Sequence, residues 1–341
     1  MKNLKGLDKI VFFLNSLIAT MLILAYLLPY ASPKNFALLS VISLAVPLLI
    51  LLNILFVIYW LLKVKKQLIL SLFVLIIGYA YVGSLYKFSS SKNVESSNNI
   101  SIMSYNVRLF NVYNWIDEEN VGKQISDFII DIDPDVISFQ EYHPSEDINM
   151  RASYQYKFEH LSGSRMRHGQ AIWSKYPILN SGSIEFEGSA NNAIYADIIK
   201  NEDTIRVYNV HLQSSGINSD VEELKKEESQ KLLQRVASTF KMQQAQAEKV
   251  VGHLKSSPYK TVICGDFNNT AYSYVYKLIK GDLVDTFERA GNGFGRTFDF
   301  KYFPVRIDFI LADEEFQINH FKTYDLKLSD HFPILSKVAL P

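Results

Sequence analysis

Three long stretches without a charged side chain, all within the first 86 residues, constrain the fold of this chain more than any other feature. They cover residues 10–33, 35–62 and 67–86, and they are rich in Leu, Ile and Ala. A helix needs roughly 20 apolar residues to cross about 30 Å of hydrocarbon. The alternative, helices buried in a soluble core, rarely has uncharged runs of this length, so we predict three transmembrane helices. Pro47 lies inside the second stretch and could kink it, which membranes tolerate.

The lysines around these stretches predict an orientation. Three precede the first stretch, three separate the second from the third, and one separates the first from the second: Lys2, Lys5 and Lys9; Lys63, Lys65 and Lys66; and Lys34. Because cytoplasmic loops carry an excess of Lys and Arg, we expect a multi-pass protein with a cytoplasmic N-terminus and an extracytoplasmic chain after Tyr86. If the first stretch is a signal peptide, the two remaining spans leave the C-terminal part on the same side.

The charge balance changes near residue 100. Residues 1–100 contain nine Lys and two acidic residues, whereas residues 101–341 contain 26 Lys and Arg and 33 Asp and Glu. Such a shift marks a domain boundary, and the acidic part argues against a broad basic surface for nucleic acid. We expect a three-span transmembrane anchor (1–86), a flexible linker rich in Ser and Asn (87–99) and one soluble domain (100–341).

Short runs rich in β-branched residues alternate with helical patterns after residue 100. Eight runs predict strands at 101–106, 136–140, 171–174, 193–199, 204–212, 261–265, 306–311 and 332–338. Residues 118–132 and 220–254 show helical spacing, the second with an apolar stripe. Many strands with few helices favour an α/β sandwich, in which two packed β-sheets are flanked by helices.

Polar residues end or interrupt several of these strands in six short segments. The segments are SYNVR (104–108), PDVISFQE (134–141), NVHL (209–212), GDFNN (265–269), RIDFI (306–310) and SDHFPI (329–334). In order and spacing they resemble the endonuclease/exonuclease/phosphatase (DNase-I-like) superfamily over about residues 101–341. The resemblance implies a four-layer α/β sandwich, preceded here by the transmembrane helices, and a hydrolase that cleaves phosphoester bonds with a divalent metal.

The resemblance assigns metal ligands at three strand ends. It makes Glu141 the principal ligand and gives Asn106 a part in holding the metal or the phosphate, while Asp330 is a second carboxylate on the metal side. The competing interpretations are a capping or surface Glu141 and an Asn106 that only closes a turn. Carboxylate and amide oxygens suit Mg²⁺ or Mn²⁺.

The same resemblance assigns the residues that act on the phosphate. Asp266 resembles the base or aligner of the attacking water, with Asn268 orienting the water or contacting the phosphate. His331 and Asp308 resemble an Asp–His pair in which the carboxylate favours the charged imidazole. His211 is a phosphate contact, with a buried, hydrogen-bonded strand histidine as the alternative. Which of these groups is the general base stays open.

Five further residues receive supporting roles. Arg165, Arg167 and His168 precede the strand AIWS and are candidates for contacts with substrate phosphates, although surface positions are an equal alternative. Gln140 is expected to support Glu141 from the second layer of contacts, as partners of metal ligands commonly do. Thr297 resembles the threonine of the family's Gly-rich segment.

The substrate is left open by these patterns. One hypothesis is a nuclease or general phosphodiesterase outside the cytoplasm, and a second is a hydrolase of phospholipid or sphingomyelin-like head groups at the membrane surface. A third is a tethered binding protein without activity, which the complete polar set disfavours. The expected partners are a phosphoester substrate, either nucleic acid or lipid head group, and the bilayer; no obligate protein partner can be inferred.

Overall fold

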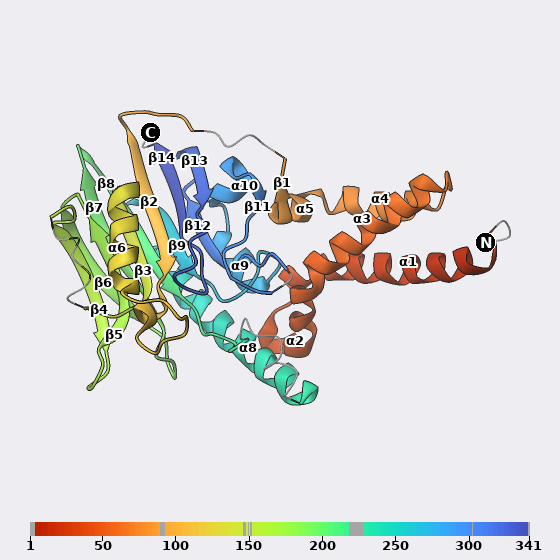
Figure 1. Ribbon diagram of the computed structural model, residues 1–341, viewed down its shortest axis with the longest axis horizontal. Coiled ribbons are helices and arrows are strands. Elements are labelled where there is room, and N and C mark those ends of the chain that lie inside the picture. The colour runs from red at the N-terminus through yellow and green to blue at the C-terminus, as the bar shows by residue number, and fades with distance from the viewer. Residues whose placement is uncertain are drawn as a thin grey trace.

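The computed structural model describes seven parts of the chain: residues 4–88, 93–145, 148, 150, 152–217, 228–301 and 303–339. Two six-stranded β-sheets pack face to face, helices cover their outer faces, and a helical stalk projects from one side (Figure 1). The predicted four-layer α/β sandwich preceded by apolar helices is therefore confirmed. Three elements of the predictions lie outside the described residues: Lys2, residues 89–92 of the linker and residues 220–227 of the second helix.

The first sheet has the strand order β13-β14-β2-β3-β5-β4. Its strands are β2 (Asn99–Asn106), β3 (Val136–Tyr142), β4 (Tyr156–Ser162), β5 (His168–Ser174), β13 (Gln317–Thr323) and β14 (Ile334–Ala339). The neighbours β2 and β3 run parallel, and the other pairs in this sheet are antiparallel.

The second sheet repeats this arrangement in the order β10-β12-β9-β8-β7-β6. Its strands are β6 (Ile178–Glu185), β7 (Asn192–Lys200), β8 (Asp203–His211), β9 (Lys260–Asp266), β10 (Val284–Asp285) and β12 (Asp308–Ala312). Here β8 and β9 form the parallel pair. Each sheet therefore has two parallel strands near its centre, whose carboxyl ends lie side by side.

Alternating side chains of both sheets fill the layer between them, as the two-residue period of a strand requires. Ile102 and Val136 from the first sheet meet Val207 and Val262 from the second in one buried cluster. The opposite faces are covered by helices, namely α6 (Val121–Ile132) on the first sheet and α8 (Ser229–Leu254) and α9 (Tyr274–Lys280) on the second. The short α10 (Thr286–Ala290) packs against β13 and β12 and adds Phe287 and Ala290 to the cluster between the sheets.

All eight predicted strands occur, with ends that differ by a few residues. Within the two sheets, strands β4, β6, β10 and β13 were not predicted, and each lies at an edge of its sheet. Edge strands carry polar, partly exposed side chains, as in ILNSGSIE of β6, so they lack the apolar run by which a central strand is recognised.

The three apolar stretches form the stalk and its base. Their elements are α1 (Gly6–Ala25), η1 (Leu28–Tyr30), α2 (Pro33–Ser40), η2 (Val41–Ala45), α3 (Val46–Leu62), α4 (Leu68–Ile77) and α5 (Tyr79–Leu85). Two helical segments, Gly6–Tyr30 and Pro33–Leu62, are long and apolar enough to cross a membrane. The third stretch is bent by 80° at Gly78, between α4 and α5, and counts as a span only if both helices are taken together.

The second stretch is interrupted by the 3₁₀ turn η2, and Pro47 follows in the first turn of α3. A proline is harmless there because the first N–H groups of a helix have no intrahelical acceptor. The interruption separates α2, which packs along α8 at the base of the stalk, from α3, which runs outward beside α1 (Figure 1).

The stalk is attached to the sandwich by specific contacts as well as by the chain. Ser32 Oγ donates a hydrogen bond of 2.9 Å to Oε1 of Gln244, and the hydroxyl of Tyr272 donates one of 3.2 Å to the carbonyl of Tyr81. Strand β1 (Tyr86–Lys87) pairs with β11 (Gly293–Phe294), so the first residue of the predicted linker belongs to a small sheet. These contacts fix the base of the stalk against the domain.

Candidate active site

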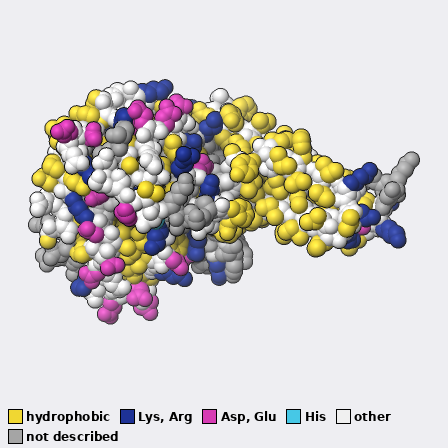
Figure 2. Space-filling model, turned by 90° about the horizontal axis from the view of Figure 1, so that it is seen from above, with side chains coloured by type: hydrophobic (Ala, Val, Ile, Leu, Met, Phe, Trp, Pro, Cys, Tyr) yellow, Lys and Arg dark blue, Asp and Glu magenta, His cyan; other side chains and the backbone are white. Residues whose placement is uncertain are grey.

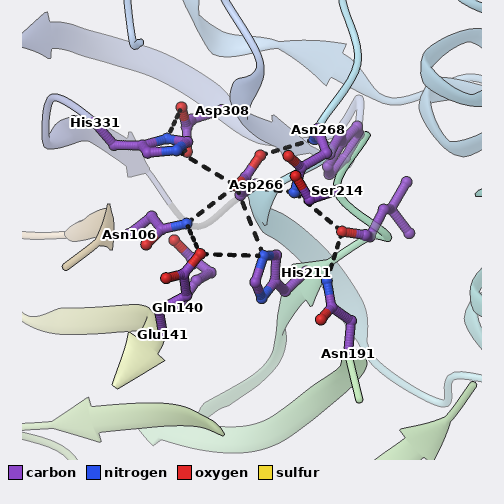
Figure 3. A network of polar contacts seen from close by, with 12 residues as sticks. Asn106, Gln140, Glu141, Asn191, His211, Ser214, Asp266, Asn268, Asp308 and His331 are labelled. Carbon is purple, nitrogen blue, oxygen red and sulfur yellow. Dashed lines mark hydrogen bonds and ion pairs between the residues drawn. The ribbon is translucent and has the colours of Figure 1, made fainter. Parts of the chain in front are cut away.

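The strand topology brings the predicted polar residues to one end of the sandwich. Asn106 ends β2, Glu141 is the last but one residue of β3, His211 ends β8 and Asp266 ends β9. Asp308 begins β12 and pairs in register with Asp266. Because the parallel pairs of both sheets end on the same side, side chains separated by up to about two hundred residues in sequence converge (Figure 3).

Asp266 lies at the centre of this group and is buried. Its Oδ1 accepts a hydrogen bond of 2.7 Å from the backbone N–H of Asn268, and its Oδ2 accepts bonds of 3.1 Å from the side-chain amides of Asn268 and Asn106. The preceding Gly265 has a φ of +135°, and a Cβ added there would lie 2.0 Å from the carbonyl oxygen of Val210. Only glycine fits, so the close approach of β8 and β9 sets the position of Asp266.

His331 and Asp308 form the expected pair. Nδ1 of His331 lies 3.0 Å from Oδ2 of Asp308, and its Nε2 lies 3.7 Å from Oδ2 of Asp266. The hydroxyl of Thr297 accepts hydrogen bonds of 3.0 Å from the backbone N–H groups of Ile307 and Asp308, which fixes the start of β12. The sequence does not reveal this support of Asp308 by Thr297, because the hydroxyl of Thr297 contacts the backbone N–H of Asp308 and not its side chain.

Glu141 reaches the group because β3 is distorted at its end. The register of β3 with β5 shifts between Phe139 and Tyr142, and Glu141 has a φ of +49°. Such an irregularity re-aims a side chain. The amide of Asn106 donates a hydrogen bond of 3.2 Å to Oε1 of Glu141, and Nε2 of His211 lies 3.9 Å from the same oxygen.

The charges of the group are set by burial and by its own members. Burial raises the pKa of Asp266 above its usual value, although His331 opposes the change. Burial alone would lower the pKa of His331, but the carboxylates of Asp308 and Asp266 outweigh it and raise that pKa to about 10. Burial lowers the pKa of His211, against the attraction of Glu141. The site therefore combines a charged histidine with a neutral one.

The donor atoms of this site fit a hard divalent cation. The carboxylates of Glu141 and Asp266 converge on the side-chain amide nitrogen of Asn106, whose Oδ1 accepts a hydrogen bond of 3.1 Å from the backbone N–H of Arg108. Ligand atoms of Asp266, Asp308 and His331 lie within 4.8 Å of one another. Nε2 of His211 is buried and makes no hydrogen bond to a described residue, although two carboxylates lie within 3.9 Å. Oxygen-rich sites of this kind suit Mg²⁺ or Mn²⁺, whereas thiolate-preferring metals need other ligands.

The remaining predicted residues lie around this centre. Oδ2 of Asp330 lies 2.7 Å from a guanidinium nitrogen of Arg108, so this carboxylate already has a charged partner. His168 begins β5, and Arg165 and Arg167 lie in the turn between β4 and β5, at the sheet end where β3 finishes. None of the contacts among the described residues joins these three side chains to the carboxylates, and their contact with a substrate stays a prediction.

Several supporting residues were not singled out by sequence reasoning. Nε2 of Gln140 donates a hydrogen bond of 2.5 Å to Oδ1 of Asn209, and the amide of Asn209 donates one of 2.7 Å to the carbonyl of Phe139. Ser329 donates a hydrogen bond of 2.8 Å to the carbonyl of Asn106. Asn209 and Ser329 belong to the motifs NVHL and SDHFPI, so their place in those motifs was the available signal.

Comparison with known families supports this arrangement. Residues 103–331 match the endonuclease/exonuclease/phosphatase family. The chain belongs to this family. Residues 8–85, which form the stalk and its base, match a domain of unknown function (DUF8431). No curated protein sequence matches the chain.

Solved structures of endonuclease/exonuclease/phosphatase proteins share the fold. The D. rerio TDP2 in complex with a single-strand DNA product has a TM-score of 0.53 at 18% identity, covering 72% of this chain and 100% of that one. A family protein from Bacteroides thetaiotaomicron gives 0.54 at 17% identity over 72% and 100% of the two chains. The human Nocturnin catalytic domain with bound sulfate gives 0.54 at 14% identity over 73% and 97%.

The family membership gives the site its general chemistry. Endonuclease/exonuclease/phosphatase proteins generally hydrolyse phosphoester bonds and depend on a divalent metal, and this chain has the family's fold together with a group of residues that could hold such an ion.

Proposed function

We propose that this chain is a membrane-anchored, divalent-metal-dependent hydrolase of phosphodiesters. The observation that carries the proposal is the convergence of Glu141, Asp266 and His331 at one end of the sandwich, where all three line the same cavity. Phosphodiester hydrolysis needs positive charge against the phosphoryl oxygens and a base that aligns water, and these side chains offer both.

The geometry suggests a role for each residue. Asp266 aligns the attacking water and accepts its proton, since its carboxylate is fixed by Asn268 and faces the group. The water oxygen forms a bond to phosphorus, one ester P–O bond breaks, and the proton ends on the released alcohol. His331, held in its charged form by Asp308, donates a hydrogen bond to a phosphoryl oxygen. Neutral His211 and the amide of Asn268 contact the phosphate.

The metal ligands follow from the oxygen donors. Glu141 and Asn106 would hold Mg²⁺ or Mn²⁺, with Asp330 as a further carboxylate on that side. When bound, the ion supplies positive charge against the phosphoryl oxygens. Gln140 keeps the end of β3 in place through Asn209, and Thr297 does the same for the start of β12.

We further propose that the soluble domain lies outside the cytoplasm, after a three-span anchor and a linker. The surface of the stalk is hydrophobic, with lysines gathered at the end far from the domain (Figure 2). At this end Lys63 lies 2.5 Å from the carboxylate of Asp8, so the start of α1 lies beside the end of α3. The positive-inside rule favours a cytoplasmic position for this end. The test is a phosphatase reporter that is active only outside the cytoplasm. Fused after Asn99, it should be active, and an inactive fusion would contradict this orientation.

The hydrolase proposal is tested with the purified full chain and bis-p-nitrophenyl phosphate. We expect p-nitrophenol release that requires Mg²⁺ or Mn²⁺ and falls at least about a hundredfold in Asp266→Asn. Release that is equal with and without the ion would contradict the metal requirement. No release at all, with the ion bound, would favour a binding protein without activity.

A nuclease is the second candidate. The D. rerio TDP2, which shares the fold, is solved with a single-strand DNA product. Against this candidate stands the acidic balance of residues 101–341, since nucleic-acid binding usually depends on a basic surface. Plasmid DNA and a single-stranded oligonucleotide, incubated with the same protein and metal, distinguish the two.

A further inference from the structure

One cavity connects the catalytic residues with the membrane anchor. It has a volume of about 860 Å³ and is lined at one end by Glu141, Asp266 and His331. At the other end its wall includes Leu48 of α3 and Leu85 of α5, which belong to the base of the stalk. This volume falls within the range of roughly 300–1,000 Å³ that small-molecule sites occupy.

The second wall of this interface cavity comes from the soluble domain and is also apolar. Phe300, Phe303 and Val305, in the segment between β11 and β12, line it together with the aromatic ring of Tyr272. Glu141, Asp266 and His331 put charge at the catalytic end. Beside the apolar walls the lining also includes Lys301 and Arg306, and Arg306 lies 2.7 Å from a carboxylate oxygen of Asp285, so a ligand that fits the cavity has a charged end and a largely apolar end. A nucleic-acid strand, which is charged along its whole length, does not match this division.

The walls of the interface cavity are held in place by contacts between anchor and domain. Tyr81 and Tyr272 stack with ring centroids 6.1 Å apart, and Glu288 accepts a hydrogen bond from Ser84. Lys34 lies 2.5 Å from a carboxylate oxygen of Glu248. Because Leu44 and Leu48 belong to the segment Pro33–Leu62, which is apolar enough to cross a membrane, the anchor end of the cavity is where a lipid chain would enter from the bilayer.

We infer that the substrate is an amphipathic phosphodiester of the membrane, whose phosphate lies at the catalytic residues while its hydrocarbon chain occupies the interface cavity. The inference rests on the proposed hydrolase function and adds no chemical step to it. Burial of methylene groups between Leu48 and Phe303 would strengthen binding with each added carbon, since every buried methylene favours the apolar environment. The anchor is then part of the substrate site as well as an attachment.

The test compares two phosphodiesters that release p-nitrophenol, methyl p-nitrophenyl phosphate and dodecyl p-nitrophenyl phosphate. The full chain is assayed with Mg²⁺ or Mn²⁺ in detergent micelles, and the quantity followed is the ratio of kcat/KM for the dodecyl ester to that for the methyl ester. We expect this ratio to exceed about one hundred in the unaltered protein. Partition of the dodecyl ester into micelles also raises the ratio, so variants are required.

Leu48→Trp places a larger side chain in the interface cavity, and Leu55→Trp makes the same change on α3 at a position that does not line it. Leu48 is 50% exposed and Leu55 is 59% exposed, so the two positions are matched. The dodecyl ester partitions into micelles equally in the assays of both variants. We therefore expect the ratio of kcat/KM for the dodecyl ester to that for the methyl ester to fall at least about tenfold in Leu48→Trp and to stay within about twofold of the parent in Leu55→Trp. Phe303→Ala, on the domain wall, gives the same test if Leu48→Trp fails to fold.

The outcomes separate this inference from the function on which it rests. Turnover of the methyl ester with an unchanged ratio in both Leu48→Trp and Phe303→Ala would overturn the chain-binding role and leave the hydrolase intact. Faster cleavage of a single-stranded oligonucleotide than of the dodecyl ester would replace the lipid with nucleic acid. Absence of turnover even for the methyl ester would sink the hydrolase proposal, and this inference with it.

Discussion

Nδ1 of His331 lies 3.0 Å from Oδ2 of Asp308, and both side chains are almost completely buried. The carboxylates of Asp308 and Asp266 overcome the effect of burial and raise the pKa of His331 from 6.5 to about 10. A histidine whose pKa is higher in the folded than in the unfolded chain binds more protons when folded. Its contribution to stability is therefore fully present below about pH 6.5 and is lost as the pH rises through about 10.

Asp308→Asn should remove most of this contribution without removing the backbone hydrogen bonds to Thr297. In metal-free protein with a chelator, we expect the variant to melt below the parent near pH 6.5, because the charged ring then loses its partner. The difference in melting temperature between parent and variant should narrow or reverse near pH 10, where the parent buries the Asp308 carboxylate beside a neutral His331 ring. Thermal unfolding followed by circular dichroism measures this. A difference that is equal at both pH values would show that Asp308 does not hold the histidine charge.

The three central side chains should each be needed for turnover. Glu141→Gln, Asp266→Asn and His331→Gln keep the approximate shape of the side chain and remove the charge or the imidazole. We expect each to lower kcat/KM for bis-p-nitrophenyl phosphate by at least about a hundredfold. Glu187→Gln, at an exposed carboxylate paired with Lys249, is the matched control and should retain activity. Near-normal rates in the three variants would refute the assignment of the site.

Metal binding should be visible without any substrate. We expect Mg²⁺ or Mn²⁺ to raise the melting temperature of the chelator-treated parent, because an ion that binds only the folded protein stabilises it by mass action. Glu141→Gln should lose most of this increase, since a neutral amide replaces the principal carboxylate ligand. The same increase in parent and variant would place the ion elsewhere.

The central strands and the motif residues could be predicted because each signal is local. Apolar runs indicate buried strands, and they end at Asn106, Glu141, His211 and Asp266. A polar side chain at the end of a buried strand is expected to lie at the edge of the sheet, outside the core. Their convergence needed the resemblance to a known fold, since no spacing in the sequence states which strands run parallel.

The remaining features depend on contacts between distant segments. The docking of α2 on α8 through Ser32 and Gln244 joins residues that are far apart in sequence and that carry no motif. The pairing of Arg108 with Asp330, and the interface cavity beside Leu48, likewise arise only when the stalk and the sandwich are placed together. From the sequence we expected only a flexible linker to connect the anchor with the domain, because the composition of a segment does not reveal which distant residues contact it.

Gly265 allows a test of how the fold positions Asp266. Its φ of +135° and the carbonyl of Val210, 2.0 Å from where a Cβ would lie, leave no room for another residue. We expect Gly265→Ala to lower the free energy of unfolding by about 2–3 kcal/mol and to reduce activity in the protein that still folds, because β9 must move away from β8. Gly252→Ala, in α8 with open space around it, should instead raise stability by about 0.5–1 kcal/mol. Denaturant titration of both variants measures the contrast, and equal stability for the two would show that the strand approach does not constrain this turn.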